Sequence, residues 1–115
     1  MTTIRIGLIY GTNVYSIIMN HNWDKKRTEK YIMEQYDTES TLIELLHKGN
    51  NMDNDGTYTY MYTIDSSISD FLTHGMKLLC NHFYIMKEGV WYKCDPYTYN
   101  DILTEFKFIK LSNYI

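Results

Sequence analysis

The sequence predicts one small α+β domain over residues 1–115, with a mostly antiparallel sheet and three to four helices. Three observations support this prediction. A chain of 115 residues has the usual length of a single domain. Hydrophobic residues make up 44% of the chain and charged residues 22%, as is typical of globular proteins. Segments of alternating apolar residues are mixed with segments of helical periodicity, without a regular strand–helix–strand repeat.

The chain is expected to begin with two strands and a helix. Apolar side chains alternate along residues 4–10, as they do in a half-buried strand. A turn at residues 11–13 then returns the chain into a second strand over 14–19. Residues 24–36 form a charged segment with apolar residues at helical spacing, which predicts a helix with one inner side.

A second helix and a strand follow. The helix is capped by Asp37 or Thr38, carries a leucine stripe and stops at Gly49. Residues 50–56 form a polar loop, and residues 57–64 alternate strictly, which predicts a strand. On one side of this strand we expect Tyr58, Tyr60, Tyr62 and Ile64.

The next helix is expected from Ser67 to about Leu79. Ser67 and Asp70 have the spacing of a capping box, with Asp in place of Glu or Gln. Gly75 weakens this helix and is a candidate for its end, because glycine is a poor helix former.

A hairpin and a last helix are expected near the end of the chain. Residues 83–87 and 90–94 alternate on either side of Glu88-Gly89, which predicts two paired strands joined by a two-residue turn. Asp95-Pro96 is typical of a helix start and predicts a helix over 95–106. Residues 108–111 suggest a final strand.

Composition and charge limit the classes of partner. The formal charge is −3, whereas nucleic-acid binders carry a basic face, so direct nucleic-acid binding is not expected. The basic cluster in 25–30 is interpreted as a solvated helix face. No apolar segment reaches the length of a membrane span, and Cys80 and Cys94 are too few for a disulfide framework. These features predict a cytoplasmic protein with reduced thiols.

The sequence has no alanine, one proline and twelve tyrosines. Alanine is the best helix former, so its absence has no structural reason. The favoured residues have A/T-rich codons, which suggests an A/T-rich genome such as that of a phage, a virus or a mobile element.

The predicted hairpin brings several chemically useful side chains to one face. Pairing around Glu88-Gly89 places the following residues together: His82, Tyr84, Met86, Trp91, Lys93 and Asp95. His82, the hairpin, Trp91 and Asp95 resemble the His-hairpin-Asp segment of papain-like and ubiquitin-specific cysteine proteases, over about 14 residues. That resemblance implies a small hydrolase or degenerate protease that uses His82 and Asp95. In those families the nucleophilic cysteine lies on a helix far upstream, whereas no cysteine precedes Cys80 in this chain, so Cys80 is the candidate that remains. The alternative is that Asp95 caps a helix and Trp91 belongs to the core.

Two sets of residues are candidate metal sites. Residues 51–56 resemble the start of an EF-hand loop, but Tyr62 stands where that loop needs its glutamate. A zinc set of His74, Cys80, His82 and Cys94 has no familiar spacing. We therefore expect no metal and no cofactor.

The clustered tyrosines favour a non-catalytic binding protein that blocks a host protein or complex, such as an anti-CRISPR-like anti-defence inhibitor, because tyrosine is enriched at interface centres. The expected partner-binding residues are Tyr58, Tyr60, Tyr62, Asp53, Asp55, Glu88, Trp91, Tyr97 and Tyr99. Acidic side chains could instead mimic nucleic-acid phosphates, and the candidates are Asp53, Asp55, Asp65, Glu88, Asp95, Asp101 and Glu105. A homodimer formed through the tyrosines is a further alternative.

Overall fold

The computed structural model describes residues 2–49, 51–52, 57–99 and 102–111; for residues 51–52, 95–99 and 102–108 it describes the backbone alone. The elements follow one another as β1 (Thr2–Tyr10), β2 (Asn13–His21), α1 (Lys25–Gln35), α2 (Glu39–Lys48), β3 (Asn51–Met52), β4 (Tyr58–Asp65), α3 (Ile68–Lys77), β5 (His82–Lys87), β6 (Val90–Tyr99) and β7 (Ile102–Lys110). None of the helices in the described ranges is long and apolar enough to cross a membrane.

The strands form one mixed sheet in the order β3-β4-β2-β1-β5-β6-β7. The expected α+β domain is thus confirmed in outline, with three helices in the described part of the chain. The expectation of a mostly antiparallel sheet needs a correction at the centre, where β1 and β5 run parallel. The other neighbouring strands pair antiparallel.

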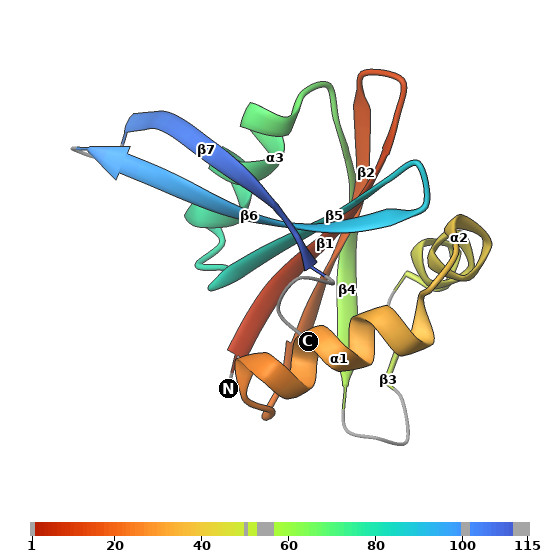
Figure 1. Ribbon diagram of the computed structural model, residues 1–115. Coiled ribbons are helices and arrows are strands. Elements are labelled where there is room, and N and C mark those ends of the chain that lie inside the picture. The colour runs from red at the N-terminus through yellow and green to blue at the C-terminus, as the bar shows by residue number, and fades with distance from the viewer. Residues whose placement is uncertain (1, 50, 53–56, 100–101, 112–115) are drawn as a thin grey trace.

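The parallel pair arises from a crossover that the sequence pattern did not reveal. β4 runs antiparallel to β2, which runs antiparallel to β1, so β4 and β5 point in the same direction. Helix α3 connects β4 to β5 across one face of the sheet (Figure 1). The carboxyl ends of β4, β1 and β5 therefore lie at the same edge of the sheet, a position where α/β folds often place ligand sites.

Two hydrophobic cores lie on opposite faces of the sheet. On one face, α1 and α2 cover Ile4, Ile6 and other alternate residues of the central strands, and we call this cluster the α1–α2 core. On the other face, Phe71 and Leu72 of α3 pack with Phe83 and neighbouring residues, and we call this cluster the α3 core. Each central strand contributes to both cores because its side chains alternate between faces.

The helix boundaries follow the local signals. Asp24 caps α1, Thr38 caps α2 in a capping box with Thr41, and Ser67 caps α3. Gly75 does not end α3, which continues to Lys77. A Cβ atom at this position would lie 2.2 Å from Phe83 Cε1, so glycine is needed for the close approach of α3 to β5.

The hairpin of β5 and β6 has the predicted register, with Lys87 opposite Val90 and Tyr84 opposite Lys93. The prediction of a helix over residues 95–106 is wrong, because β6 continues to Tyr99 and pairs with β7. Residues 95–99 pair with β7 beyond the part of β6 that pairs with β5. Pro96, which has no N–H to donate, is tolerated where a strand has a neighbour on one side.

A bulge in β4 changes the predicted sides of the tyrosines. Tyr60 of β4 pairs with Ile18 of β2, and Thr63 of β4 pairs with Ser16 of β2. Between these two pairs β4 therefore contains one residue more than β2. Met61 lies in this bulge with a φ of 58°. A bulge adds one unpaired residue, so the side chains after it point to the opposite face from those before it. The expectation that Tyr62 and Ile64 share a side with Tyr58 and Tyr60 is therefore wrong.

Candidate functional site

The residues after the bulge contribute to an exposed apolar area beside α2. We call Tyr10, Ile43, Tyr62 and Ile64 the Tyr62 surface. Tyr10 is 72% exposed, Ile64 is 54% exposed and Tyr62 is 45% exposed. Ile64 lies opposite Tyr15, which packs against the α1–α2 core, so these side chains share the face that α2 covers. Exposed aromatic and aliphatic side chains gathered in this way mark interaction surfaces more often than isolated ones do.

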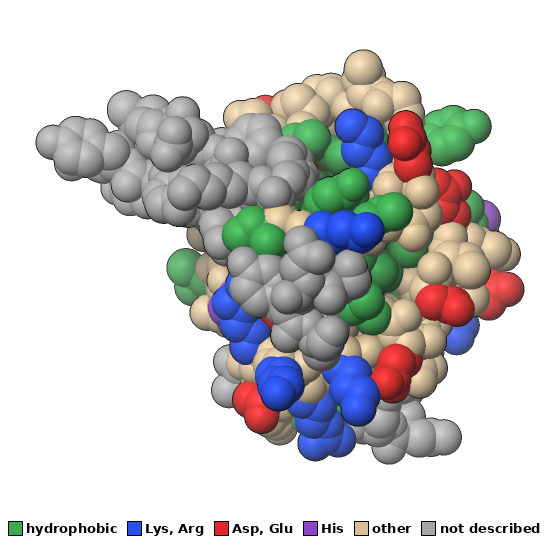
Figure 2. Space-filling view, in the orientation of Figure 1, with side chains coloured by type: hydrophobic (Ala, Val, Ile, Leu, Met, Phe, Trp, Pro, Cys, Tyr) green, Lys and Arg blue, Asp and Glu red, His purple; other side chains and the backbone are tan. Residues whose placement is uncertain are grey.

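A groove of about 380 Å³ runs between α2 and the sheet within this surface. Tyr10 and Tyr62 line it on the sheet side and Ile43 lines it on the α2 side, with Leu8, Tyr15 and Leu46 below them. His47 is the one ionisable group among the described lining residues apart from the tyrosine hydroxyls. Figure 2 shows the face with α1 and α2, where hydrophobic side chains are exposed between charged ones. The groove is suited to an apolar side chain of another molecule.

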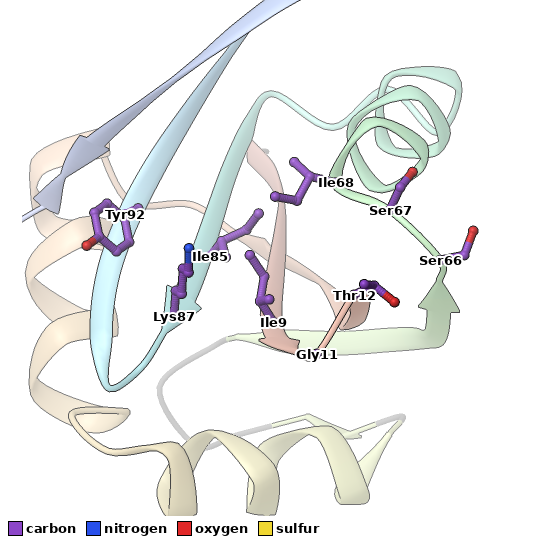
Figure 3. Close-up of a pocket in the computed structure, with 9 residues that line it drawn as sticks. All are labelled: Ile9, Gly11, Thr12, Ser66, Ser67, Ile68, Ile85, Lys87 and Tyr92. Atoms are coloured by element: carbon purple, nitrogen blue, oxygen red, sulfur yellow. The ribbon is translucent and has the colours of Figure 1, made fainter.

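A larger pocket, of about 610 Å³, lies on the opposite face of the sheet, and we call it the Ile9–Lys87 pocket. Ile9, Ile68 and Ile85 gather there from β1, α3 and β5 (Figure 3). The remaining lining residues are Gly11, Thr12, Ser66, Ser67, Lys87 and Tyr92. The interior is therefore apolar and the polar groups lie around it.

A buried polar network holds α3 against the sheet near this face. Asp65 Oδ2 lies 3.1 Å from Arg5 Nη2, and His74 Nδ1 donates to Asp65 Oδ1 at 2.6 Å. Arg5 Nη1 also donates to the carbonyl oxygen of Phe71, whose ring lies under the guanidinium. Burial lowers the pKa of Arg5, and the charge of Asp65 opposes this shift. Because Asp65 is buried in this network, it is not a surface acid able to mimic a phosphate.

A second buried network lies under α1. Tyr84 donates from its hydroxyl to Glu29 Oε2 at 2.8 Å, and Lys93 Nζ lies 3.9 Å from the same oxygen. On the outer side of α1, Lys and Arg side chains gather in one area of the surface (Figure 2). The Lys and Arg residues of the basic cluster in 25–30 are all exposed, in agreement with a solvated helix face.

The proposed hydrolase residues are not brought together in the described part of the structure. Cys80 packs against the α3 core, whereas His82 lies opposite Ile4 of the α1–α2 core, so the thiol and the imidazole belong to opposite sides of the sheet. Burial raises the pKa of the Cys80 thiol to about 11, although the nearby Arg5 partly opposes this shift. A thiol with this pKa is protonated at neutral pH and is a weak nucleophile. The side chain of Asp95 lies outside the described residues.

The candidate metal ligands are likewise separated. His74 binds Asp65, Cys80 and Cys94 belong to the α3 core, and His82 lies on the other side of the sheet. In the ranges that the structure describes, no three His, Cys, Asp or Glu side chains are grouped as metal ligands would be. Asp53, Asp55 and the rest of the EF-hand-like segment lie outside the described side chains.

The expected partner-binding residues have different locations. Tyr58 and Tyr60 stack on the face that carries α3, with ring centroids 5.4 Å apart. Trp91 is buried and donates from Nε1 to the carbonyl oxygen of Tyr36 at 2.7 Å, so it belongs to the core and not to a binding surface. Glu88 is exposed in the hairpin turn. For two further expected residues, Tyr97 and Tyr99, the structure describes the backbone in β6 alone.

Sequence reasoning missed Tyr10, Ile43 and Lys87 as site residues. Tyr10 precedes the turn at Gly11, and an aromatic residue at a strand end was a signal available in the sequence. Ile43 lies next to the leucine stripe of α2, where a half-turn of the helix decides between core and surface.

No protein-family model, curated protein or solved structure matches the chain.

Proposed function

We propose that this chain is a non-catalytic binding protein that engages another protein through the Tyr62 surface. The observation that carries this proposal is the gathering of exposed Tyr10, Tyr62 and Ile43 around an apolar groove, with exposed Ile64 on the same face of the sheet. Tyrosine offers a large apolar area and a polar tip at a low cost in side-chain entropy, which is why it is common at the centres of interfaces. The occupant that fits is a protein segment presenting an apolar side chain to the groove.

The charges around the groove support an apolar contact over phosphate mimicry. Its described lining contains no carboxylate, and Asp65 is buried inside the protein, where it forms an ion pair with Arg5 and a hydrogen bond with His74. Binding through the Tyr62 surface should therefore depend little on salt, because screening acts on exposed charges. The A/T-rich codons implied by the composition suggest that a phage, a virus or a mobile element encodes this chain. We therefore propose that the partner is a protein of its host.

The chain offers a matched pair of variants for the test. Tyr62→Ala removes a ring from the Tyr62 surface, and Tyr58→Ala removes a similarly exposed ring from the same strand on the opposite face, with exposures of 45% and 38%. The tagged wild-type chain is first used to recover a binding partner from cells. The purified partner is then titrated with each variant by calorimetry.

The expected result is a tenfold or greater loss of affinity for Tyr62→Ala, since truncating a central interface residue costs about 1–2 kcal/mol or more. Tyr58→Ala should bind as the wild type does. Equal affinities of both variants, or a loss confined to Tyr58→Ala, would contradict the proposal. Sedimentation at several concentrations separates the homodimer alternative, in which Tyr62→Ala converts a dimer into a monomer.

A further inference from the structure

The Ile9–Lys87 pocket lies at a point of the sheet where the chain connections diverge. β1 and β5 are parallel neighbours, and the strands that follow them lie on opposite sides: β2 beyond β1, and β6 beyond β5. The pocket opens at the carboxyl ends of these two strands, and it is lined by Ile9 of β1, Gly11 of the turn after β1, and Ile85 and Lys87 of β5. Here both following connections are hairpins, so the pocket forms between the turn after β1, the end of β5 and the start of α3. The carboxyl ends of parallel strands are also where open α/β sheets commonly bind small ligands.

The walls of the pocket are suited to an apolar body. Ile9 and Ile68 are partly exposed and Ile85 is buried, so the isoleucines leave apolar area facing the cavity. Tyr92, which is partly exposed, closes the side formed by β6 (Figure 3). A volume of about 610 Å³ lies within the range of about 300–1,000 Å³ that is usual for small-molecule sites.

The charge at the pocket favours a ligand with a negative charge. Lys87 is exposed, is the one charged side chain among the described lining residues and forms no ion pair with a described residue. The first turn of α3 also carries a partial positive charge, but Asp70 lies in that turn and accepts from Ser66 Oγ at 3.2 Å. An anionic group is therefore better placed at Lys87 than at the helix end.

We propose that the Ile9–Lys87 pocket binds a small amphipathic anion, with its apolar body among Ile9, Ile68 and Ile85 and its anionic group at Lys87. A medium-chain aliphatic carboxylate has this chemistry. The site is independent of the Tyr62 surface, because the two lie on opposite faces of the sheet.

Octanoate is a suitable probe, and its binding to the full chain is measured by NMR titration with butyrate and octan-1-ol as comparison ligands. The expected result is that shifts map to residues around Ile68 and Ile85. Affinity should rise about two- to fourfold for each added methylene, because each buried methylene is favourable by about 0.8 kcal/mol. Octan-1-ol should bind more weakly than octanoate, since it lacks the charge.

Two lysine variants complete the test. Lys87→Met keeps the aliphatic stem and removes the charge, and Lys77→Met makes the same change at an exposed position of α3 away from the pocket. Lys87→Met should weaken octanoate binding about three- to tenfold and leave octan-1-ol unchanged, whereas Lys77→Met should change neither. Affinity independent of chain length, equal loss in both variants, or shifts confined to the Tyr62 surface would overturn the proposal.

Discussion

Replacing Gly75 by alanine tests whether α3 is packed against the sheet as the structure shows. In a solvent-exposed helix, alanine is more favourable than glycine by about 1 kcal/mol. Here the added Cβ would lie 2.2 Å from Cε1 and 3.0 Å from Cζ of Phe83, and 3.1 Å from Cδ of Arg5. Carbon atoms in contact are normally about 3.5–4.0 Å apart, so the helix or the ring has to move. Overpacking costs about 1–3 kcal/mol, and a contact of 2.2 Å favours the upper part of this range, about 2–3 kcal/mol, which outweighs the gain in helix propensity.

We therefore expect Gly75→Ala to lower the free energy of unfolding by about 1–2 kcal/mol, measured by urea denaturation. Thr73→Ala, at a partly exposed position of the same helix, controls for the general effect of alanine in α3. In a Phe83→Leu background the ring is gone, and Gly75→Ala should become neutral or stabilising. An increase in stability for Gly75→Ala in the wild-type background would refute the close packing of α3 on β5.

Three further outcomes follow from buried ionisable groups. Asp65→Asn leaves the buried guanidinium of Arg5 without its anion and should lower the free energy of unfolding by about 3–5 kcal/mol in urea; a loss under about 1 kcal/mol would contradict the buried pair. With its pKa raised to about 11, Cys80 should react slowly with iodoacetamide at pH 8 and faster as the pH approaches 11, and rapid labelling at pH 7 would revive the nucleophile hypothesis. Burial, with a smaller effect of His82, lowers the pKa of His21 in the folded protein. In the unfolded chain the pKa of this histidine is about 6.5, so below that pH the unfolded chain binds more protons at His21 than the folded protein does. The free energy of unfolding therefore falls as the pH falls. His21→Gln should reduce this loss between about pH 7 and pH 5 in pH-dependent denaturation, and an unchanged slope would exclude His21 as its source.

Local signals were sufficient for much of the fold. The caps at Asp24, Thr38 and Ser67 each place a side-chain acceptor at the start of a helix, and the structure places α1, α2 and α3 directly after them. Glu88 and Gly89 both have positive φ angles of 52° and 78°, as a two-residue turn between twisted strands requires. These features depend on a few neighbouring residues, so the sequence determines them without knowledge of the whole sheet.

The wrong assignments arise where distant segments decide the outcome. Asp95-Pro96 is a good helix start by itself, but the structure places this segment in β6, paired with β7. Nine residues of β7 provide a partner for the strand that no local signal at Asp95 could reveal. The parallel pairing of β1 with β5 has the same origin, since it depends on the path of α3 across the sheet.

The bulge at Met61 has the largest effect on the functional interpretation. Strict alternation from Tyr58 to Ile64 predicts one continuous tyrosine face, and a single extra residue divides it into two. One part stacks Tyr58 on Tyr60, so that these rings contact each other. The other part joins Tyr62 to Tyr10 and α2 around a groove, which a flat row of rings on one strand would not have formed. The proposed binding surface therefore depends on the register between β2 and β4, and Tyr58 provides the internal control because it lies on the same strand before the bulge.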